Sequence, residues 1–529
     1  MRNLISNILN KIKNQPIDIG FFFLFLLTFS LSIRKVMLYF PIQGTFNEYT
    51  GIYIYLSDIF LTLAIGSWLF VLLYNKTIKL SNYKLWITYL IHKLYLLLPL
   101  LLVIWSFISI SWSSNQIIAF YRSVKLLEFY LLYLYIIFRI IPKCSTWNIL
   151  NFLKIILFTG FIQSCLGIAQ FISQKSVGLT FLKESITAPN IPGVAKIVLN
   201  GEKYIRAYGL FPHPNILGGF LVFSIILTVL YLKLFHVEQL VFLRNRILNE
   251  KGDNIKEYFL TKKQLFENKW LIKAILLIQL AALALTFSKS AILGLIIAFL
   301  YISFKFFQIC LIVSKCSTWN IWKFYGMEQF NLFKHFRIAI LSFLIILTSL
   351  WVIYKPDLNS LFFQSLKERL FYLNVPHGTF LDNFFHGTGF GQFVLSIPLF
   401  YQKVILPWQH QPIHNVFLLI WTELGIIGFG LFAWLIGKLF HMEQLENKEI
   451  GDRKENNLSI LNNKYSILSS KIPLIHFKGI LLAFIFIMLF DHYFWDIQQG
   501  SLLLWMVIGV VAGLNRKLKT PSVFGGIKS

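Results

Sequence analysis

Val416-Phe-Leu-Leu-Ile-Trp-Thr-Glu-Leu-Gly-Ile-Ile-Gly-Phe-Gly-Leu-Phe-Ala-Trp-Leu-Ile-Gly437 is an apolar run interrupted by a single charged residue, Glu423. Its length suits the roughly 20 helical residues that cross the hydrocarbon core of a bilayer. Other apolar runs of this kind are Phe21–Ile33, Leu94–Ile110, Ile216–Leu232 and Ile338–Tyr354. The sequence therefore predicts an all-α fold, that of a polytopic membrane protein.

The composition favours a membrane protein over a soluble one. The chain has 529 residues, of which 57% are hydrophobic, 17% aromatic and 14% charged. Soluble domains carry about 25% charged residues. Four cysteines lie in or beside the apolar runs and offer no disulfide framework: Cys144, Cys165, Cys310 and Cys316.

The apolar runs predict twelve transmembrane helices. Basic residues precede the first run, but no small-residue cleavage site follows it, so we interpret it as a retained helix rather than a signal peptide. The predicted helices are 19–40, 58–74, 94–112, 121–141, 151–173, 215–235, 271–287, 290–313, 338–354, 414–437, 478–494 and 500–514.

The distribution of Lys and Arg predicts the orientation. With the N-terminus in the cytoplasm, most of the 49 basic residues fall on the cytoplasmic side, as the positive-inside rule requires. The protein is then a multi-pass plasma (inner) membrane protein with both termini cytoplasmic. It divides into a cytoplasmic N-terminus (1–18), nine helices (19–354), a large, partly helical extracytoplasmic loop (355–413), three helices (414–514) and a cytoplasmic tail (515–529).

The net charge of +26 needs no partner beyond membrane lipids. The basic residues are scattered through several short loops and form no continuous stripe, which argues against a nucleic-acid partner. The same orientation places two long loops, 174–214 and 355–413, outside the cell. Long loops between helices tend to carry function.

Polar and glycine-rich motifs gather on this predicted outer face. Three cations and one imidazole there suit a diphosphate substrate, because Arg offers bidentate donors and Lys a point charge. An imidazole can also accept a proton from a hydroxyl near neutral pH. The motifs are Arg206–Asn215, Thr286–Ser290, Lys367–Leu370, and the turn Gly387–Gly391 followed by His414-Asn415.

These motifs, over roughly residues 20–515, resemble the O-antigen ligase and O-antigen polymerase superfamily. The resemblance rests on the order of Gly209-Leu-Phe-Pro-His-Pro-Asn215, Thr286-Phe-Ser-Lys-Ser290, Gly387–Gly391, His414-Asn415 with Glu423-Leu-Gly425, and Asp491-His-Tyr-Phe-Trp-Asp496. It implies a metal-independent, cofactor-free, inverting membrane glycosyltransferase. Such an enzyme transfers a glycan from undecaprenyl pyrophosphate to an acceptor lipid, protein or glycan.

The resemblance also implies roles for single residues. His414 matches the proposed general base, and Arg369 matches one of two basic residues that hold the pyrophosphate. The second is Lys289, where the family usually has arginine after serine, or else Arg206. Supporting positions are Ser288, Asn215, Asn415, Gly387 and Gly389.

Purely structural interpretations of these residues stay open. His414 could be a helix-boundary residue, Arg369 the polar face of a membrane-surface helix, and Lys289 a side chain that reaches headgroup phosphates. Arg206 could be a solvated charge. Asn215, with Pro212 and Pro214, suits the start of a helix, and the glycines suit turns.

A metal site is an alternative within catalysis. Four histidines fall in one loop: His377, His386, His410 and His414. His410 and His414 have helical spacing, but Pro412 between them argues against a helix that would align them. No carboxylate occupies a zincin position, so we expect no metal.

Two further alternatives concern function. A polymerase, which joins carrier-linked repeats, needs the same diphosphate site as a ligase, and we favour the ligase. A polysaccharide or lipid transporter would use intramembrane charges. The stripe of Arg122, Lys125 and Glu128 provides such charges, although it could equally line the carrier cleft.

The orientation can be tested by cysteine labelling in a background without native cysteines. We expect Ser185→Cys, in loop 174–214, to react with a membrane-impermeant maleimide in intact cells. Asn254→Cys should react only after permeabilisation, because the positive-inside rule places it in the cytoplasm. Labelling of Asn254→Cys alone in intact cells would contradict the orientation.

Overall fold

The structure is a computed structural model, and it divides the chain into two compact units. Unit one combines Met1–Ser145 with Phe362–Ser529, and unit two is Thr146–Leu361. Each unit is described below by itself. The residues that the structure describes are 16–74, 94–142, 146–199, 201–249, 255–314, 383–400, 409–441 and 457–519.

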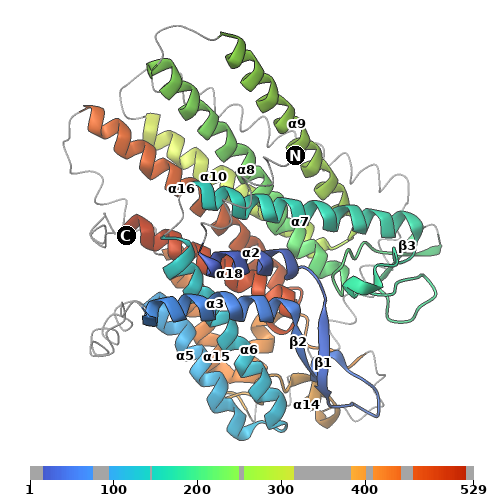
Figure 1. Cartoon of the computed structure of the whole chain (residues 1–529). Coiled ribbons are helices and arrows are strands. Elements are labelled where there is room, and N and C mark those ends of the chain that lie inside the picture. The colour runs from blue at the N-terminus through green and yellow to red at the C-terminus, as the bar shows by residue number, and fades with distance from the viewer. Residues whose placement is uncertain are drawn as a thin grey trace. The chain divides into compact units, whose positions relative to one another are not determined.

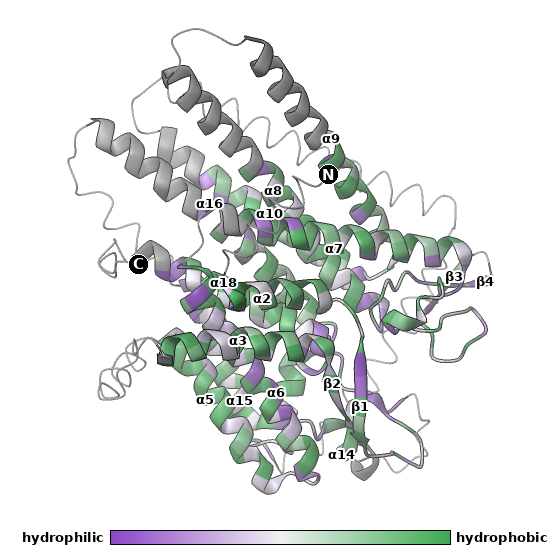
Figure 2. Ribbon diagram, viewed as in Figure 1, coloured by the Kyte–Doolittle hydropathy of each residue, from purple (hydrophilic) through white to green (hydrophobic). Residues whose placement is uncertain are grey.

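Helices dominate the described residues, and eight of them are long and apolar enough to cross a membrane. The predicted helical fold is confirmed, and the length and composition of these eight helices support a membrane protein. The eight helical segments are Leu56–Tyr74, Leu94–Trp112, Leu150–Ser173, Pro214–Leu234, Lys289–Gln308, Val416–His441, Lys471–Met488 and Gln498–Arg516. Figure 2 shows mostly hydrophobic ribbons for these helices and hydrophilic stretches in the short strands.

The remaining predicted spans have different outcomes. The predicted span 121–141 is found as helix α6 (Gln116–Tyr135) with a π-helical turn, η4 (Ile136–Ile140). The predicted span 271–287 corresponds to the apolar part of α9 (Ile255–Leu285). The predicted span 338–354 lies outside the described residues, as does most of the loop 355–413. The number twelve therefore stays a prediction.

The first predicted span, 19–40, is wrong as a single helix. Helix α2 (Ile17–Thr28) ends early, and Arg34–Tyr39 forms strand β1, which pairs antiparallel with β2 (Gly51–Tyr55). The reason is the pairing of Arg34. Its guanidinium donates to Glu48 at 2.6 Å and lies 4.4 Å from the ring centre of Tyr53. A cation with these partners is satisfied in a hairpin and would be isolated in hydrocarbon.

Unit one packs around α6. α2 lies along α3 (Leu56–Tyr74), and α5 (Leu94–Ile108) contacts both α6 and α15 (Val416–His441) (Figure 1). A buried ion pair links α2 to η4, the π-helical turn that follows α6. Arg139 donates to both carboxylate oxygens of Asp18, at 2.6 and 2.7 Å. The pair satisfies two charges that would otherwise be costly in this apolar setting.

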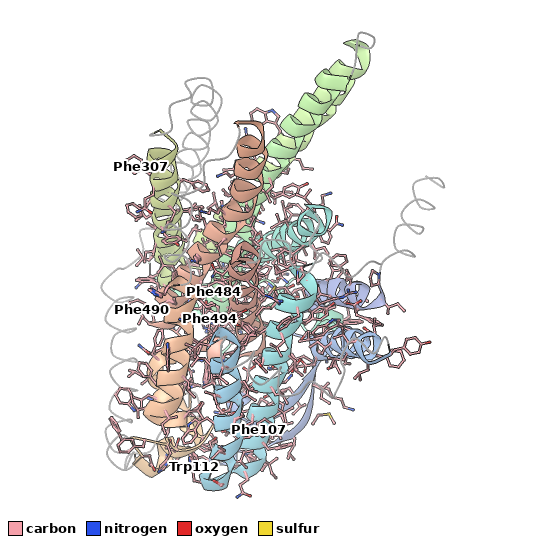
Figure 3. All side chains as sticks on the ribbon, turned by 90° about the vertical axis from the view of Figure 1, so that its left-hand side faces the viewer. Phe107, Trp112, Phe307, Phe484, Phe490 and Phe494 are labelled. Atoms are coloured by element: carbon pink, nitrogen blue, oxygen red, sulfur yellow. The ribbon has the colours of Figure 1, made fainter. Side chains whose placement is uncertain are left out.

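Aromatic side chains fill the contact between α16 (Asn457–Met488) and the short helix α17 (Tyr493–Asp496). The ring centres of Phe484 and Phe494 lie 4.4 Å apart (Figure 3). Both helices also pack against α18 (Gln498–Lys519). This packing fixes the segment between α16 and α17, which carries His492.

Helix α15 is broken at Gly425, where φ is 67° and ψ is −174°. The chain segment 384–389 lies across the break and pairs with the backbone there. Thr388 and Gly389 donate their N–H groups to the carbonyls of Thr422 and Glu423, both at 2.9 Å. Trp105 donates its indole N–H to the carbonyl of Leu424. The break therefore leaves these three carbonyls hydrogen-bonded, as a membrane interior demands.

Unit two is built from α7 (Thr146–Ser173), α8 (Pro214–Asn249), α9 and α10 (Lys289–Ser314). A buried polar contact links three of them. Gln279 of α9 donates to Ser224 and accepts from Thr228, both in α8, and Ser224 donates to the backbone carbonyl of Ile156 in α7. A Cβ at Gly160 would lie 1.9 Å from the Ser224 hydroxyl, so only glycine allows α7 this close. The hairpin β3 (Lys196–Leu199) and β4 (Glu202–Ile205) follows α7.

The break in α15 can be tested with a matched pair of glycine substitutions. Gly425→Ala would strain a positive φ and place a Cβ 2.0 Å from the carbonyl oxygen of Phe385. The backbone strain alone costs about 1–3 kcal/mol. Gly430→Ala, in the same helix, meets nothing within 4 Å.

We expect Gly425→Ala to lower the midpoint of thermal unfolding in detergent by several degrees, and Gly430→Ala to leave it unchanged or slightly raised. Equal midpoints for the two variants would show that the described conformation of Gly425 is not needed for stability.

Candidate functional site

Four of the predicted site residues come together in unit two. The guanidinium of Arg206 donates to the backbone carbonyl of Thr286 at 2.6 Å and to the side-chain oxygen of Asn215 at 2.5 Å. Thr286 belongs to the turn between α9 and α10, which also carries Ser288 and Lys289. Arg206 and Lys289, predicted as alternatives, thus belong to one cluster, which we call the basic turn.

The basic turn is held by its neighbours. Gln170 of α7 accepts the N–H of Gly209 and donates to its carbonyl, both at 2.8 Å. The same amide donates to Glu184, whose carboxylate also accepts three backbone N–H groups, from residues 177–179. Burial alone would raise the pKa of Glu184. The four hydrogen bonds to its carboxylate lower the pKa by more than burial raises it, so the pKa lies below its usual value. Glu184 is therefore an anion that is linked through Gln170 to Gly209, in the loop that carries Arg206.

Helix α8 begins as the sequence predicts, with Pro214 in its first turn. The cap comes from a different residue. The ring of His213 accepts the N–H of Asn215 at 3.2 Å, while the side chain of Asn215 accepts from Arg206. Lys289 is exposed at the start of α10, and Ser288 beside it is buried.

His414 lies in unit one, immediately before α15. Its Nδ1 is 3.2 Å from the carbonyl of Pro412, and its ring centre is 5.0 Å from that of His492. His492 in turn contacts a carboxylate oxygen of Asp496 through Nδ1, at 2.9 Å. His414, His492 and Asp496 thus form a chain of neighbours at one end of α15.

Asn415 is the residue that begins α15. Its side-chain oxygen accepts the N–H of Leu418 at 3.0 Å, which is an N-cap, and its amide donates to the carbonyl of Leu489. Such a cap typically contributes about 1 kcal/mol. Asn415 fixes where the helix starts and so fixes the position of His414.

Gly387 and Gly389 serve the backbone in this structure. Both have positive φ, 73° and 104°. A Cβ on Gly387 would lie 2.4 Å from the carbonyl carbon of Glu423, and one on Gly389 would lie 2.0 Å from the hydroxyl of Ser113. Glycine is needed at 387 for close packing on broken α15 and at 389 for close packing on Ser113.

Other predicted residues have separate positions. Arg369 and His377 lie outside the described residues. His386 packs its ring against Trp112, with centres 5.2 Å apart. His410 is buried, with both ring nitrogens lacking a hydrogen-bond partner, and burial lowers its pKa. Within the described ranges, no three His, Cys, Asp or Glu side chains are grouped to hold a metal ion.

Unit one also contains a narrow charged cleft. Two adjoining parts of it share Arg122, Phe390, Trp495 and Asp496 as lining residues. Arg122 of α6 donates to the backbone carbonyls of Asp496 and Tyr49, at 2.6 and 3.0 Å. Glu423 is buried there and accepts the indole N–H of Trp495 at 3.1 Å.

Ion pairs border this cleft. Lys125 contacts the carboxylates of Asp58 and Glu128, the latter at 3.0 Å. The Arg34–Glu48 pair lines another side. Arg122 and Lys125 were part of a stripe visible in the sequence, whereas Arg34, Glu48 and Asp58 are brought in by the β1–β2 hairpin and α3. Of these three, only Arg34 borders the first apolar run, so no common sequence pattern marked them.

Comparisons with known proteins found no matching family model, no matching curated protein and no matching solved structure.

The His492–Asp496 contact predicts a pH-dependent stability. Burial lowers the pKa of His492, but the carboxylates of Asp496, Asp491 and Glu48 outweigh it and raise the pKa above its usual value. An unfolded histidine titrates near 6.5. The contact therefore stabilises the fold fully below about pH 6.5, and this stabilisation is lost as the pH rises through the raised pKa.

We expect the difference in thermal midpoint between wild type and His492→Gln to be largest near pH 6 and to shrink towards pH 9. Asp491, Glu48 and His414 are present in both proteins, so their own titration cancels to first order in the difference. A difference that is constant over this range would contradict a charged His492.

Proposed function

We propose that this protein is a membrane glycosyltransferase of the O-antigen ligase type. It transfers a glycan from undecaprenyl pyrophosphate to an acceptor hydroxyl on the outer face of the plasma membrane. The observation that carries the proposal is the position of His414, at the start of a capped membrane helix and against the His492–Asp496 pair. It agrees with the general-base role that the sequence resemblance implies.

The tautomer of His414 supports this role. A carbonyl oxygen only accepts hydrogen bonds, so the contact with Pro412 favours the proton on Nδ1. The lone pair of the neutral ring then lies on Nε2. The orientation of a base by a backbone carbonyl is a common arrangement for histidine.

The proposed reaction is a single displacement. The acceptor hydroxyl loses its proton to Nε2 of His414 as its oxygen forms a bond to the anomeric carbon. The bond from that carbon to the pyrophosphate oxygen breaks, and the electron pair leaves with undecaprenyl pyrophosphate. Attack from the opposite face inverts the anomeric configuration.

The basic turn of unit two is, by itself, suited to binding a diphosphate. Arg206 has a guanidinium whose Nε and one Nη are already fixed by Thr286 and Asn215, so its plane is oriented before substrate binds. Lys289, three residues after Thr286, is exposed at the start of α10. A pre-oriented guanidinium stabilises negative charge on a diphosphate, and an ammonium from the same turn would add to that. Arg369 stays part of the proposal as a second arginine.

A transporter is the second candidate, and the broken helix α15 favours it, because transporters bind ions at such breaks. Here, however, the carbonyls of residues 422–424 already accept hydrogen bonds from segment 388–389 and from Trp105. They are therefore poor ion ligands. This observation favours the enzyme over the transporter.

The general base can be tested by complementation of a deletion strain. We expect His414→Ala to reduce glycan transfer by about 10²–10⁴-fold, since general-base catalysis is typically worth that much. The protein should still insert and fold. His441→Ala, an exposed histidine at the other end of α15, is the matched control and should transfer normally.

Retention of normal transfer by folded His414→Ala would refute the base. The deletion strain itself separates the two enzyme types. Accumulation of long carrier-linked polymer identifies a ligase, whereas accumulation of single carrier-linked repeats identifies a polymerase.

A further inference from the structure

The segment that follows α7 in unit two presents large apolar side chains at its surface. Phe181 is 74% exposed, Ile186 73% and Val177 47%. Two cations, Lys175 and Lys183, are exposed in the same segment. Large apolar side chains exposed together mark an interaction surface. The neighbouring cations indicate a partner that carries negative charge.

Glu184 gives this segment a fixed conformation. Its carboxylate is 8% exposed and accepts the N–H groups of residues 177–179, at 2.7, 2.8 and 2.7 Å. Residues 177–184 are thereby closed into a compact turn, which we call the Glu184 turn. Glu184 is the one carboxylate of segment 175–186, and it is buried and hydrogen-bonded. The charges that this segment exposes are therefore those of its two lysines.

The Glu184 turn is folded against the end of an apolar helix. Gln170, in the last turn of α7, donates to the carboxylate of Glu184 at 2.8 Å. The part of α7 that is apolar enough to cross a membrane is Leu150–Ser173. The contact is thus made three residues before the end of that span, which is about 4.5 Å at helical rise. The turn therefore lies level with the end of the span, where hydrocarbon meets headgroups.

The exposed face of α7 supports the same placement. Phe158, Ile162 and Ile172 are exposed on this helix, at 55%, 38% and 75%. Their spacings of 4 and 10 residues place them on one face of a helix. An apolar exposed stripe on a helix of this length is suited to contact with lipid. The stripe ends at Ile172, five residues before Val177.

We infer that the Glu184 turn binds the surface of the bilayer, with Val177 and Phe181 among the headgroups and with Lys175 and Lys183 on the phosphates of anionic lipids. Apolar burial and attraction to anionic lipid add in such contacts, and lysine stems reach headgroups readily. The inference goes beyond the proposed function and requires only that α7 spans the membrane.

The lipid contact has a consequence for the basic turn. Gln170 holds both the Glu184 turn and the backbone of Gly209, whose N–H and carbonyl it contacts at 2.8 Å. Gly209 lies three residues after Arg206. Lipid bound at the Glu184 turn therefore sets the depth at which the loop that carries Arg206 meets the bilayer.

The test uses the full-length protein, without its native cysteines, in nanodiscs of phosphatidylcholine and phosphatidylglycerol. The environment-sensitive fluorophore NBD is attached to Val177→Cys. As a matched control it is attached to Lys203→Cys, an exposed charged position in β4 of the same loop. Lipids that carry a nitroxide at the headgroup end of an acyl chain quench NBD on contact.

We expect blue-shifted emission and strong quenching for the label at 177, and neither for the label at 203. Phe181→Ser should lower the quenching at 177, because the turn loses its largest exposed apolar side chain, whereas Phe181→Leu should retain it. Absence of quenching at 177, or equal quenching at both positions, would overturn the inference. A blue-shifted label at 177 that no lipid quenches would also overturn it, since protein would then cover the turn.

The lysines are tested with the same label at 177. Nitroxide-labelled phosphatidylglycerol should quench it about twofold more than the phosphatidylcholine analogue, because lysines attract anionic headgroups. Lys175→Gln combined with Lys183→Gln should make the two lipids equal, and Lys203→Gln should leave the difference intact. Equal quenching by both lipids with all lysines present would refute the contact with anionic lipid. None of these measurements involves glycan transfer, so their failure leaves the glycosyltransferase proposal standing.

Discussion

The pairing of segment 384–389 with the break in α15 is the constraint on which unit one depends. In hydrocarbon, backbone groups must be hydrogen-bonded within the protein, and the break at Gly425 interrupts the helical ladder. The donated N–H groups of Thr388 and Gly389 restore two of those bonds. Because that segment is anchored, the next residues are too: Phe390 reaches Trp495, and Gly391 packs against Arg122. The charged cleft is a consequence of this backbone contact.

The sequence predicted the apolar helices well, because an apolar run of about 20 residues has the length that a helix needs to cross the hydrocarbon core. It failed at residues 19–40, where a run of similar hydropathy becomes a helix and a strand. Hydropathy does not reveal that Arg34 forms an ion pair with Glu48 and stacks on the ring of Tyr53, because these residues come close to Arg34 only when the hairpin forms. Gly387 and Gly389 were recognised as turn formers, but the break at Gly425 was not predicted, because the packing of these glycines depends on two segments that the sequence does not pair.

The candidate site was predictable only where its residues have a local sequence signal. His414-Asn415 stood out as polar residues at a helix start, and Asn415 is the cap. The grouping of Arg206 with the turn at Thr286 required tertiary structure, because a hydrogen bond between residues 80 positions apart leaves no local signal. Arg122 was visible as an intramembrane charge. Its partners were not, since Asp496 and Tyr49 offer it backbone carbonyls, which every residue has.

The proposal assigns the general base to His414, which lies immediately before α15. Its central claim is that a glycosidic bond is exchanged at the membrane. The most direct measurement incubates the purified protein in nanodiscs with carrier-linked glycan extracted from a deletion strain and with the host's acceptor fraction. The account predicts release of free undecaprenyl pyrophosphate in equal amount to newly attached glycan, with an inverted anomeric linkage. If the glycan instead stays on its carrier and only crosses the bilayer of reconstituted vesicles, the protein is a transporter and the account is wrong.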